Sequence, residues 1–347
     1  MLRVAAEGSP VRKSRRRSGA VTLHDVAKLA GVAPITASRA INTPEHVSEA
    51  VRAKVAEAIA RTGYVPNFLA GGLASQRSRL VAAVVPTISG PVFLQTIQSL
   101  TEALADRGYQ LMLGQSGYSS DREDALLRAI IGRRPDGIVL TGIMHSVDGR
   151  RSLLAAGIPV VETWDLTPTP IDMLVGFSHE EIGRSVAAFL HSKGRRRLAV
   201  ISGSDERAMR RQTAFQATAR ALGIGEVRVV AVPAPTTLQS GRAALVDLMQ
   251  GGGPKPDAVF CSSDLLALGV LTQAQVSSIA VPKRLAIVGF GDLEFAADVH
   301  PALTTVRIDG GAIGRQASQF IVDRAEGRTL DRRVVDIGFA ILERETT

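Results

Sequence analysis

From Leu80 onward, short apolar segments alternate with longer amphipathic segments, and this alternation constrains the fold more than any other feature of the chain. Apolar runs such as Leu80–Val85 and Gly137–Leu140 have the length of buried strands, and the segments between them show helical periodicity. Strands that alternate with helices form parallel sheets with helices on both faces. We therefore predict an α/β body of two similar lobes, with the chain crossing between them near Val175–Ser178.

The end of the chain is expected to return to the first lobe. Thr304–Arg307 has the apolar character of a strand, and Ile313–Glu326 that of a helix. With these segments, the predicted first lobe comprises about 79–176 and 306–332, and the second lobe about 177–305 and 333–345.

The first part of the chain predicts a small helical domain. Thr22 and Asp25 form a variant of the capping box at the start of one helix, which Gly31 ends. Pro34 suits the first position of a second, short helix, and a third helix is expected over Glu49–Thr62. A helix, a turn that contains glycine and a short helix are the pattern of a helix-turn-helix domain.

The positive charge of the chain lies almost entirely at this end. Residues 1–78 contain 12 Lys and Arg and 5 Asp and Glu, whereas residues 79–347 contain 29 and 28. A basic module on a nearly neutral body indicates a polyanionic partner for the module. The run from Arg12 to Arg17 by itself is equally consistent with a solvated basic tail.

Composition and motifs exclude several other classes. The apolar fraction of 45% supports a packed core, and Cys261 is the only cysteine, which excludes a disulfide framework. No apolar run is long enough to span a membrane, and no signal peptide is apparent, so a cytoplasmic protein is expected. No P-loop, no Gly-x-Ser-x-Gly elbow and no metal-ligand spacing occurs, so we expect neither an enzyme nor a cofactor or metal site.

Residues 22–42, from Thr22-Leu23-His24-Asp25 to Ala40-Ile41-Asn42, resemble the DNA-binding domain of the LacI/GalR family of transcription regulators. The resemblance continues through Gly63-Tyr64-Val65-Pro66-Asn67 and covers about 22–345. It implies a helix-turn-helix domain at 21–65 after a basic tail at 1–20. A hinge segment at 66–78 and an effector-binding and dimerisation core at 79–345, similar to periplasmic sugar-binding proteins, would follow.

The resemblance also implies which residues contact DNA. Pro34, Ile35 and Arg39 take the base-reading positions of the recognition helix, and Arg39 suits a bidentate contact with guanine. Ala33 replaces the usual serine, which removes a helix cap and a phosphate contact. The residues expected to contact phosphates are Thr22, Thr36, Ser38, Asn42 and His46.

The hinge of the family corresponds here to Asn67–Ala74, where Asn67, Ala70 and Leu73 are expected at the DNA. Leu73 matches a leucine that family members insert into a minor-groove step. Gly71 and Gly72 weaken a helix by about 1 kcal/mol each, so this helix is expected to form only on DNA. The alternative is a linker whose leucine contacts the body.

For the effector, Arg211 matches the arginine that family members direct at the ligand, and Arg207 lies one turn earlier on the same helix face. Gly291 stands where many sugar-binding members carry an aspartate. Two arginines and a missing carboxylate favour an anion. A solvated helix face is the alternative for both arginines. Further pocket candidates are Phe93, Tyr118, His145, Glu162, Trp164, Ser263 and Asp292.

Several short stretches, among them Gly114-Gln115-Ser116-Gly117-Tyr118, resemble the gluconate-utilisation repressors within this family. The resemblance therefore implies a repressor, dimeric and associated with the bacterial nucleoid, that a sugar acid such as gluconate releases from a palindromic operator. A regulator that responds to a neutral sugar or needs a corepressor is the alternative. A sugar-binding receptor or an enzyme on the same fold is the alternative of another class.

Overall fold

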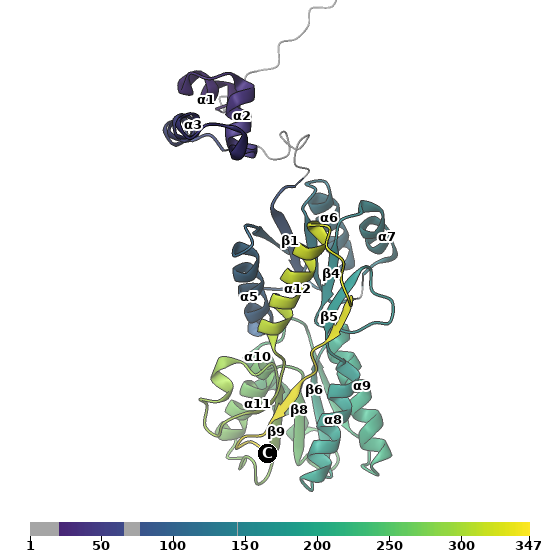
Figure 1. Cartoon of the computed structure of the whole chain (residues 1–347). Helices are drawn as coiled ribbons and strands as arrows, with labels where there is room; N and C mark the ends of the chain where they lie inside the picture. Colours follow the sequence, from purple (N-terminus) through teal and green to yellow (C-terminus); the bar gives the residue numbers. More distant parts are fainter. Residues whose placement is uncertain (1–20, 66–76, 144) are drawn as a thin grey trace, which may run out of the picture. The chain divides into compact units, whose positions relative to one another are not determined.

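The computed structural model describes residues 21–65, 77–143 and 145–347 (Figure 1). The chain divides into two compact units, residues 1–77 and 78–347, which we call the head and the body and describe separately. None of the helices in the described ranges combines the length and the apolar character that a bilayer crossing needs.

The head contains the three predicted helices. These are α1 (Leu23–Ala30), α2 (Pro34–Asn42) and α3 (Glu49–Thr62), with a short 3₁₀ turn, η1 (Pro44–His46), before α3. Val26 of α1, Ala37 of α2 and Val55 of α3 are buried at the centre of the head. Each lies on the apolar side of its helix, which faces the other two helices. The helix-turn-helix prediction is therefore confirmed.

The helix ends of the head agree with their sequence signals. The amide of Thr22 donates to a carboxylate oxygen of Asp25 at 2.9 Å, and the Thr22 hydroxyl accepts from the Asp25 amide, which completes the capping box. Gly31 ends α1 with a φ of 66°, a left-handed conformation that glycine adopts without strain. Ala33 gives α2 no side-chain cap, as its replacement of serine predicts.

In its described residues, the body contains two six-stranded sheets. The first has the order β11-β5-β4-β3-β1-β2 and is parallel throughout. The second has the order β12-β10-β9-β8-β6-β7, in which only β12 is antiparallel. The strands are β1 (Leu80–Val85), β2 (Gln110–Gln115), β3 (Gly137–Thr141), β4 (Val160–Thr163), β5 (Met173–Gly176), β6 (Leu198–Gly203), β7 (Arg228–Val232), β8 (Ala258–Cys261), β9 (Ala286–Phe290), β10 (Thr304–Arg307), β11 (Val334–Asp336) and β12 (Ala340–Leu342).

Helices cover both faces of each sheet, because the strand residues that point to one face and those that point to the other are both apolar. In the first lobe, Val81 and Ala83 face α5 (Leu94–Ala105) and α12 (Gly310–Ala325), whereas Ala82 and Val84 face α6 (Ser120–Ile131) and α7 (Val147–Ala156). In the second lobe, the pairs are α8 (His179–Ser192) with α9 (Glu206–Ala221), and α10 (Leu238–Gln250) with α11 (Asp264–Val276). Short 3₁₀ turns, η2 (Pro91–Phe93) and η3 (Glu294–Ala296), complete the body.

The end of the chain differs from the prediction in two places. Thr304–Arg307 forms β10 in the second sheet, where it pairs with β9, and does not return to the first lobe. Within the segment 333–345, which was expected in the second lobe, Val334–Asp336 instead pairs with β5 of the first sheet. The chain crosses between the lobes at these points, and strand pairing between distant segments leaves no signal in local periodicity. The helix near Ile313 is confirmed in the first lobe as α12, packed on α5.

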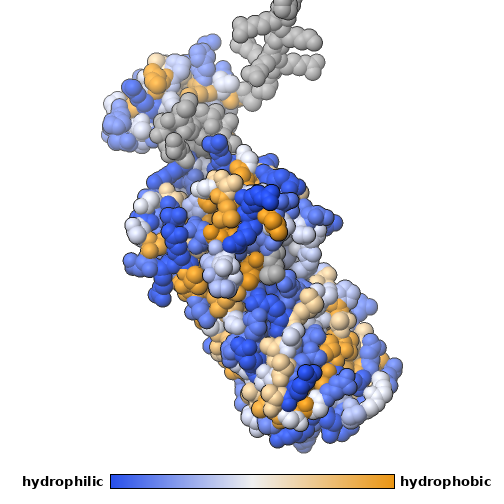
Figure 2. All heavy atoms as spheres, turned by 90° about the vertical axis from the view of Figure 1, so that its right-hand side faces the viewer, coloured by the Kyte–Doolittle hydropathy of each residue, from blue (hydrophilic) through white to orange (hydrophobic). Residues whose placement is uncertain are grey.

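The surface offers no simple guide to the site. On the face seen in Figure 2, hydrophobic side chains are interspersed with hydrophilic ones over both units. The candidate sites below therefore rest on side-chain geometry.

Candidate functional site

The exposed side of α2 carries the predicted base-reading residues. Pro34, Ile35 and Arg39 are exposed, and the Ile35 side chain has an exposed fraction of 61%. An isoleucine this open to solvent has no packing role inside the head, so it is available to a partner. Thr36 and Ser38 are half-buried on the same helix.

The predicted phosphate contacts lie around this helix. Thr22 and His46 are exposed at the start of α1 and the end of η1, and the exposed Asn42 donates from its amide to the Ser38 carbonyl oxygen at 3.0 Å. Asn67, Ala70 and Leu73, the predicted hinge contacts, lie outside the described residues.

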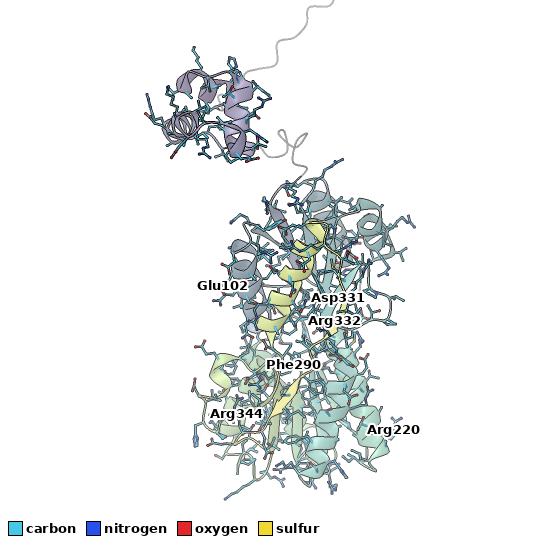
Figure 3. All side chains as sticks on the ribbon, viewed as in Figure 1. Glu102, Arg220, Phe290, Asp331, Arg332 and Arg344 are labelled. Atoms are coloured by element: carbon cyan, nitrogen blue, oxygen red, sulfur yellow. The ribbon has the colours of Figure 1, made fainter. Side chains whose placement is uncertain are left out.

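A cavity lies between the two lobes of the body at the carboxyl ends of the strands, where open α/β sheets bind ligands. Phe290, the last residue of β9, lies between the two sheets (Figure 3). Six of the predicted residues line the cavity: Phe93, Tyr118, Trp164, Arg207, Arg211 and Ser263. The fold thus brings together side chains that are up to 170 positions apart.

Arg211 is 4% exposed on α9 and is held from three sides. Its Nη1 lies 2.9 Å from Nδ1 of His179, its Nη2 donates to the Ser262 carbonyl oxygen at 3.1 Å, and its guanidinium carbon lies 4.0 Å from the centre of the Phe290 ring. Its Nε has no hydrogen-bond partner among the described residues. Burial lowers the pKa of Arg211 to about 10, so the side chain is still charged at neutral pH.

Arg207 is the second cation of the cavity. Its guanidinium lies over the Phe93 ring at 5.3 Å, and its Nη1 is buried without a partner among the described residues. The nearest carboxylate is Asp205, which caps α9 and lies 3.9 Å from Nε of Arg207. Buried guanidinium N–H groups without acceptors cost free energy until a ligand supplies the acceptors.

The backbone conformation at Gly291, in the turn after β9, suits glycine rather than a residue with a carboxylate side chain. Its φ is 130°, a conformation that residues with a side chain rarely adopt. The neighbouring Asp292 does not replace that carboxylate, because its side chain pairs with Arg344 at 2.8 Å and does not line the cavity. The prediction that Asp292 contacts the effector is therefore not supported by its position.

His145 and Glu162 also lie outside this cavity. Nδ1 of His145 lies 2.6 Å from Glu123 and its Nε2 lies 3.5 Å from Glu162, so the three side chains form a buried charged cluster in the first lobe. Glu162 accepts the Ile171 amide at 2.6 Å and has no exposed surface. The two residues form an ion pair with each other that the sequence did not predict.

This cluster predicts a pH dependence of stability. Burial alone would lower the pKa of His145, but Glu123 and Glu162 outweigh it and raise the pKa to about 9 from an ordinary 6.5. The proton therefore stabilises the folded protein fully below about pH 6.5, and this contribution, up to about 3 kcal/mol, is lost as the pH rises through about 9. Urea unfolding at pH 6 and pH 10 should show this loss in the wild type and not in His145→Gln.

His300→Gln is the matched control, because the His300 side chain is 93% exposed. It should keep the wild-type difference between the two pH values. An equal loss in His145→Gln and the wild type would contradict the role of the cluster.

Several residues of the cavity were not predicted from the sequence. His179 and Ser262 contact Arg211, Phe290 packs under its guanidinium, and Asp205, Thr87 and Thr236 line the wall. A usable signal was present, because most of these residues lie within three positions of the carboxyl end of a predicted strand. That signal selects an edge of a sheet, however, and not the side chains that point into the cavity.

A helix-turn-helix head and a two-lobed body with a cavity that contains two arginines define a DNA-binding regulator with a small-molecule sensor. Residues 22–67 match the bacterial regulatory proteins of the lacI family, and residues 187–347 match the periplasmic binding protein-like domain. The HTH-type transcriptional regulator GntR of Pseudomonas aeruginosa is 34% identical over 337 residues, 96% of this chain and 98% of that protein. GntR of Escherichia coli is 29% identical, with 92% and 96% covered.

Solved structures agree with these relatives. A LacI-family transcriptional regulator from Silicibacter pomeroyi has a TM-score of 0.88 and 31% identity, and the match covers 94% of this chain and 99% of that one. The lac repressor dimer bound to operator has a TM-score of 0.80 at 22% identity and supports the fold alone. The chain belongs to the lacI family of bacterial regulatory proteins and is a DNA-binding transcriptional regulator.

Proposed function

We propose that the protein is a dimeric repressor that leaves a near-palindromic operator when a sugar acid, D-gluconate or a close aldonate, binds between the lobes. The observation that carries this proposal is a pair of guanidinium groups, that of the buried Arg211 and that of the half-buried Arg207, each with a buried N–H that lacks an acceptor among the described residues. A carboxylate supplies such acceptors. Among the described residues that line the cavity, Asp205 is the only other charged group.

The remaining lining suits the polyol part of a sugar acid. Hydroxyl groups of Thr87, Thr236, Ser263 and Tyr118 offer hydrogen bonds, and the rings of Tyr118 and Trp164 offer flat apolar contact. A neutral sugar is the second candidate, because the carboxylate of Asp205 can accept ligand hydroxyls. A related structure, 30% identical with a TM-score of 0.67, is the regulator CelR in complex with cellobiose.

In the proposed mechanism, the exposed face of α2 binds the major groove, with Arg39 on a guanine and Pro34 and Ile35 against apolar base edges. Two heads bind the two halves of the operator. The effector binds one arrangement of the lobes more tightly and thereby lowers operator affinity. Operator DNA must lower effector affinity by the same factor.

A mobility-shift assay with DNA from upstream of the neighbouring genes tests this function. D-gluconate should release the retarded fragment, and D-glucose at the same concentration should leave it bound. Calorimetric titration of the free protein should show at least a tenfold preference for gluconate, about 1.4 kcal/mol. Equal affinity for the two compounds would contradict the sugar-acid proposal, and an absence of any retarded fragment over random DNA would contradict the repressor proposal.

A further inference from the structure

We propose that His179 is a positioning residue for effector recognition, which holds the guanidinium of Arg211 on one ring nitrogen and the backbone carbonyl of Trp164 on the other. The proposal builds on the proposed function, because it assigns to Arg211 the contact with the effector. The resemblance to the family did not indicate this histidine, and the structure alone brings its partners together.

His179 occupies a place that connects the two lobes. It is the first residue of α8, shortly after β5, where the chain passes from the first sheet to the second. Its side chain is 1% exposed, and its ring packs edge-on against Phe177 with a centroid distance of 4.9 Å. Trp164 follows β4 of the first lobe, whereas Arg211 belongs to α9 of the second. The imidazole therefore contacts one cavity residue from each lobe.

The two partners fix the protonation state of the ring. The carbonyl oxygen of Trp164, 3.0 Å from Nε2, can only accept, so Nε2 carries the hydrogen. The guanidinium of Arg211, 2.9 Å from Nδ1, can only donate, so Nδ1 must be the unprotonated acceptor. A second proton, on Nδ1, would place an imidazole N–H against the guanidinium N–H of Arg211, so that two donors would face each other.

The surrounding charges favour the same neutral tautomer. Burial lowers the pKa of His179 well below 6.5, and Arg211, Arg207 and Arg210 lower it further. The carboxylate of Asp165, 4.0 Å from Nε2, opposes them, but this carboxylate is itself paired with Arg210 at 2.6 Å. The histidine therefore remains an acceptor for Arg211 throughout the neutral pH range.

These hydrogen bonds stabilise both cavity residues. With Nη1 held by His179 and Nη2 by the Ser262 carbonyl, the guanidinium plane has one orientation, and Nε is left for the effector. Trp164 has a φ of 66°, which is strained for an aromatic residue, and its carbonyl is held by the hydrogen bond from Nε2. Loss of this acceptor allows the guanidinium of Arg211 to rotate. Binding of the effector then includes the free-energy cost of ordering that side chain.

Two conservative variants test the two ring nitrogens of His179 separately. The side-chain oxygen of His179→Asn takes the place of Nδ1 and can accept from Arg211, whereas the amide of His179→Gln reaches the place of Nε2 and leaves Arg211 without its acceptor. In calorimetric titrations of the full-length protein with D-gluconate, His179→Gln should weaken binding by about 10- to 100-fold, and His179→Asn should restore most of the affinity. The control is His191→Gln in the last turn of α8, which does not line the cavity.

A second measurement needs no ligand. Nitrogen-15 NMR of the wild type should show His179 as the neutral tautomer with the hydrogen on Nε2 at pH 6, and His179→Gln should shift the Arg211 Nε resonance. Thermal unfolding confirms that each variant is folded. A wild type that does not bind gluconate overturns the proposed effector, and the NMR result then decides the role of His179 by itself. A charged ring, the other tautomer, wild-type binding by His179→Gln or equal weakening by both variants overturns the positioning role.

Discussion

Arg211→Ala is expected to weaken D-gluconate binding by at least about 30-fold, because it removes the buried cation itself. Removing one partner of a buried, hydrogen-bonded charge pair costs about 2–5 kcal/mol. Arg211 is buried and charged at neutral pH, and its removal also leaves Nδ1 of His179 and the Ser262 carbonyl without their donor. Isothermal titration calorimetry on the full-length protein measures the effect.

Arg220→Gln is the matched control for this change. Arg220 lies in the last turn of the same helix, α9, and its side chain is exposed, away from the cavity (Figure 3). The control should bind gluconate as the wild type does. A loss of less than threefold in Arg211→Ala would show that the effector is not held by this arginine.

Val26→Asp is expected to abolish operator binding and to leave gluconate binding in place. Val26 has no exposed surface at the centre of the head, where a carboxylate would be buried without a partner at a cost of several kcal/mol. A domain of this size has a stability of only about 3–5 kcal/mol. The head should therefore unfold, and because the body is a separate compact unit, its cavity should remain intact.

Hydrogen exchange of residues 23–62, together with a mobility shift on operator DNA, measures this result. Leu29→Asp is the control on the same helix, because Leu29 is 41% exposed and its replacement buries no charge. Protection of the head should persist in Leu29→Asp. If residues 23–62 of Val26→Asp stayed protected from hydrogen exchange, the assignment of Val26 to the three-helix core would be wrong.

Local signals explain why much of the fold followed from the sequence. The capping box of Thr22 and Asp25, the proline at the start of α2 and the glycine after α1 act over four residues or fewer, so they can be read in one dimension. The strand and helix alternation of the body has the same local origin, and Arg207 and Arg211 share a helix face at a spacing of four. The resemblance to the LacI/GalR family supplied the role of these arginines.

The sequence by itself thus determined the helices of the head, the two rounds of strands and helices, and the placement of Arg207 and Arg211 on one helix face. Only the tertiary structure decided that Thr304–Arg307 joins the second sheet, that His145 and Glu162 form an ion pair away from the cavity, and that His179 contacts Arg211. The physical reason is range: caps and periodicity depend on neighbours along the chain, whereas strand pairing and buried hydrogen bonds join residues that only folding brings into contact.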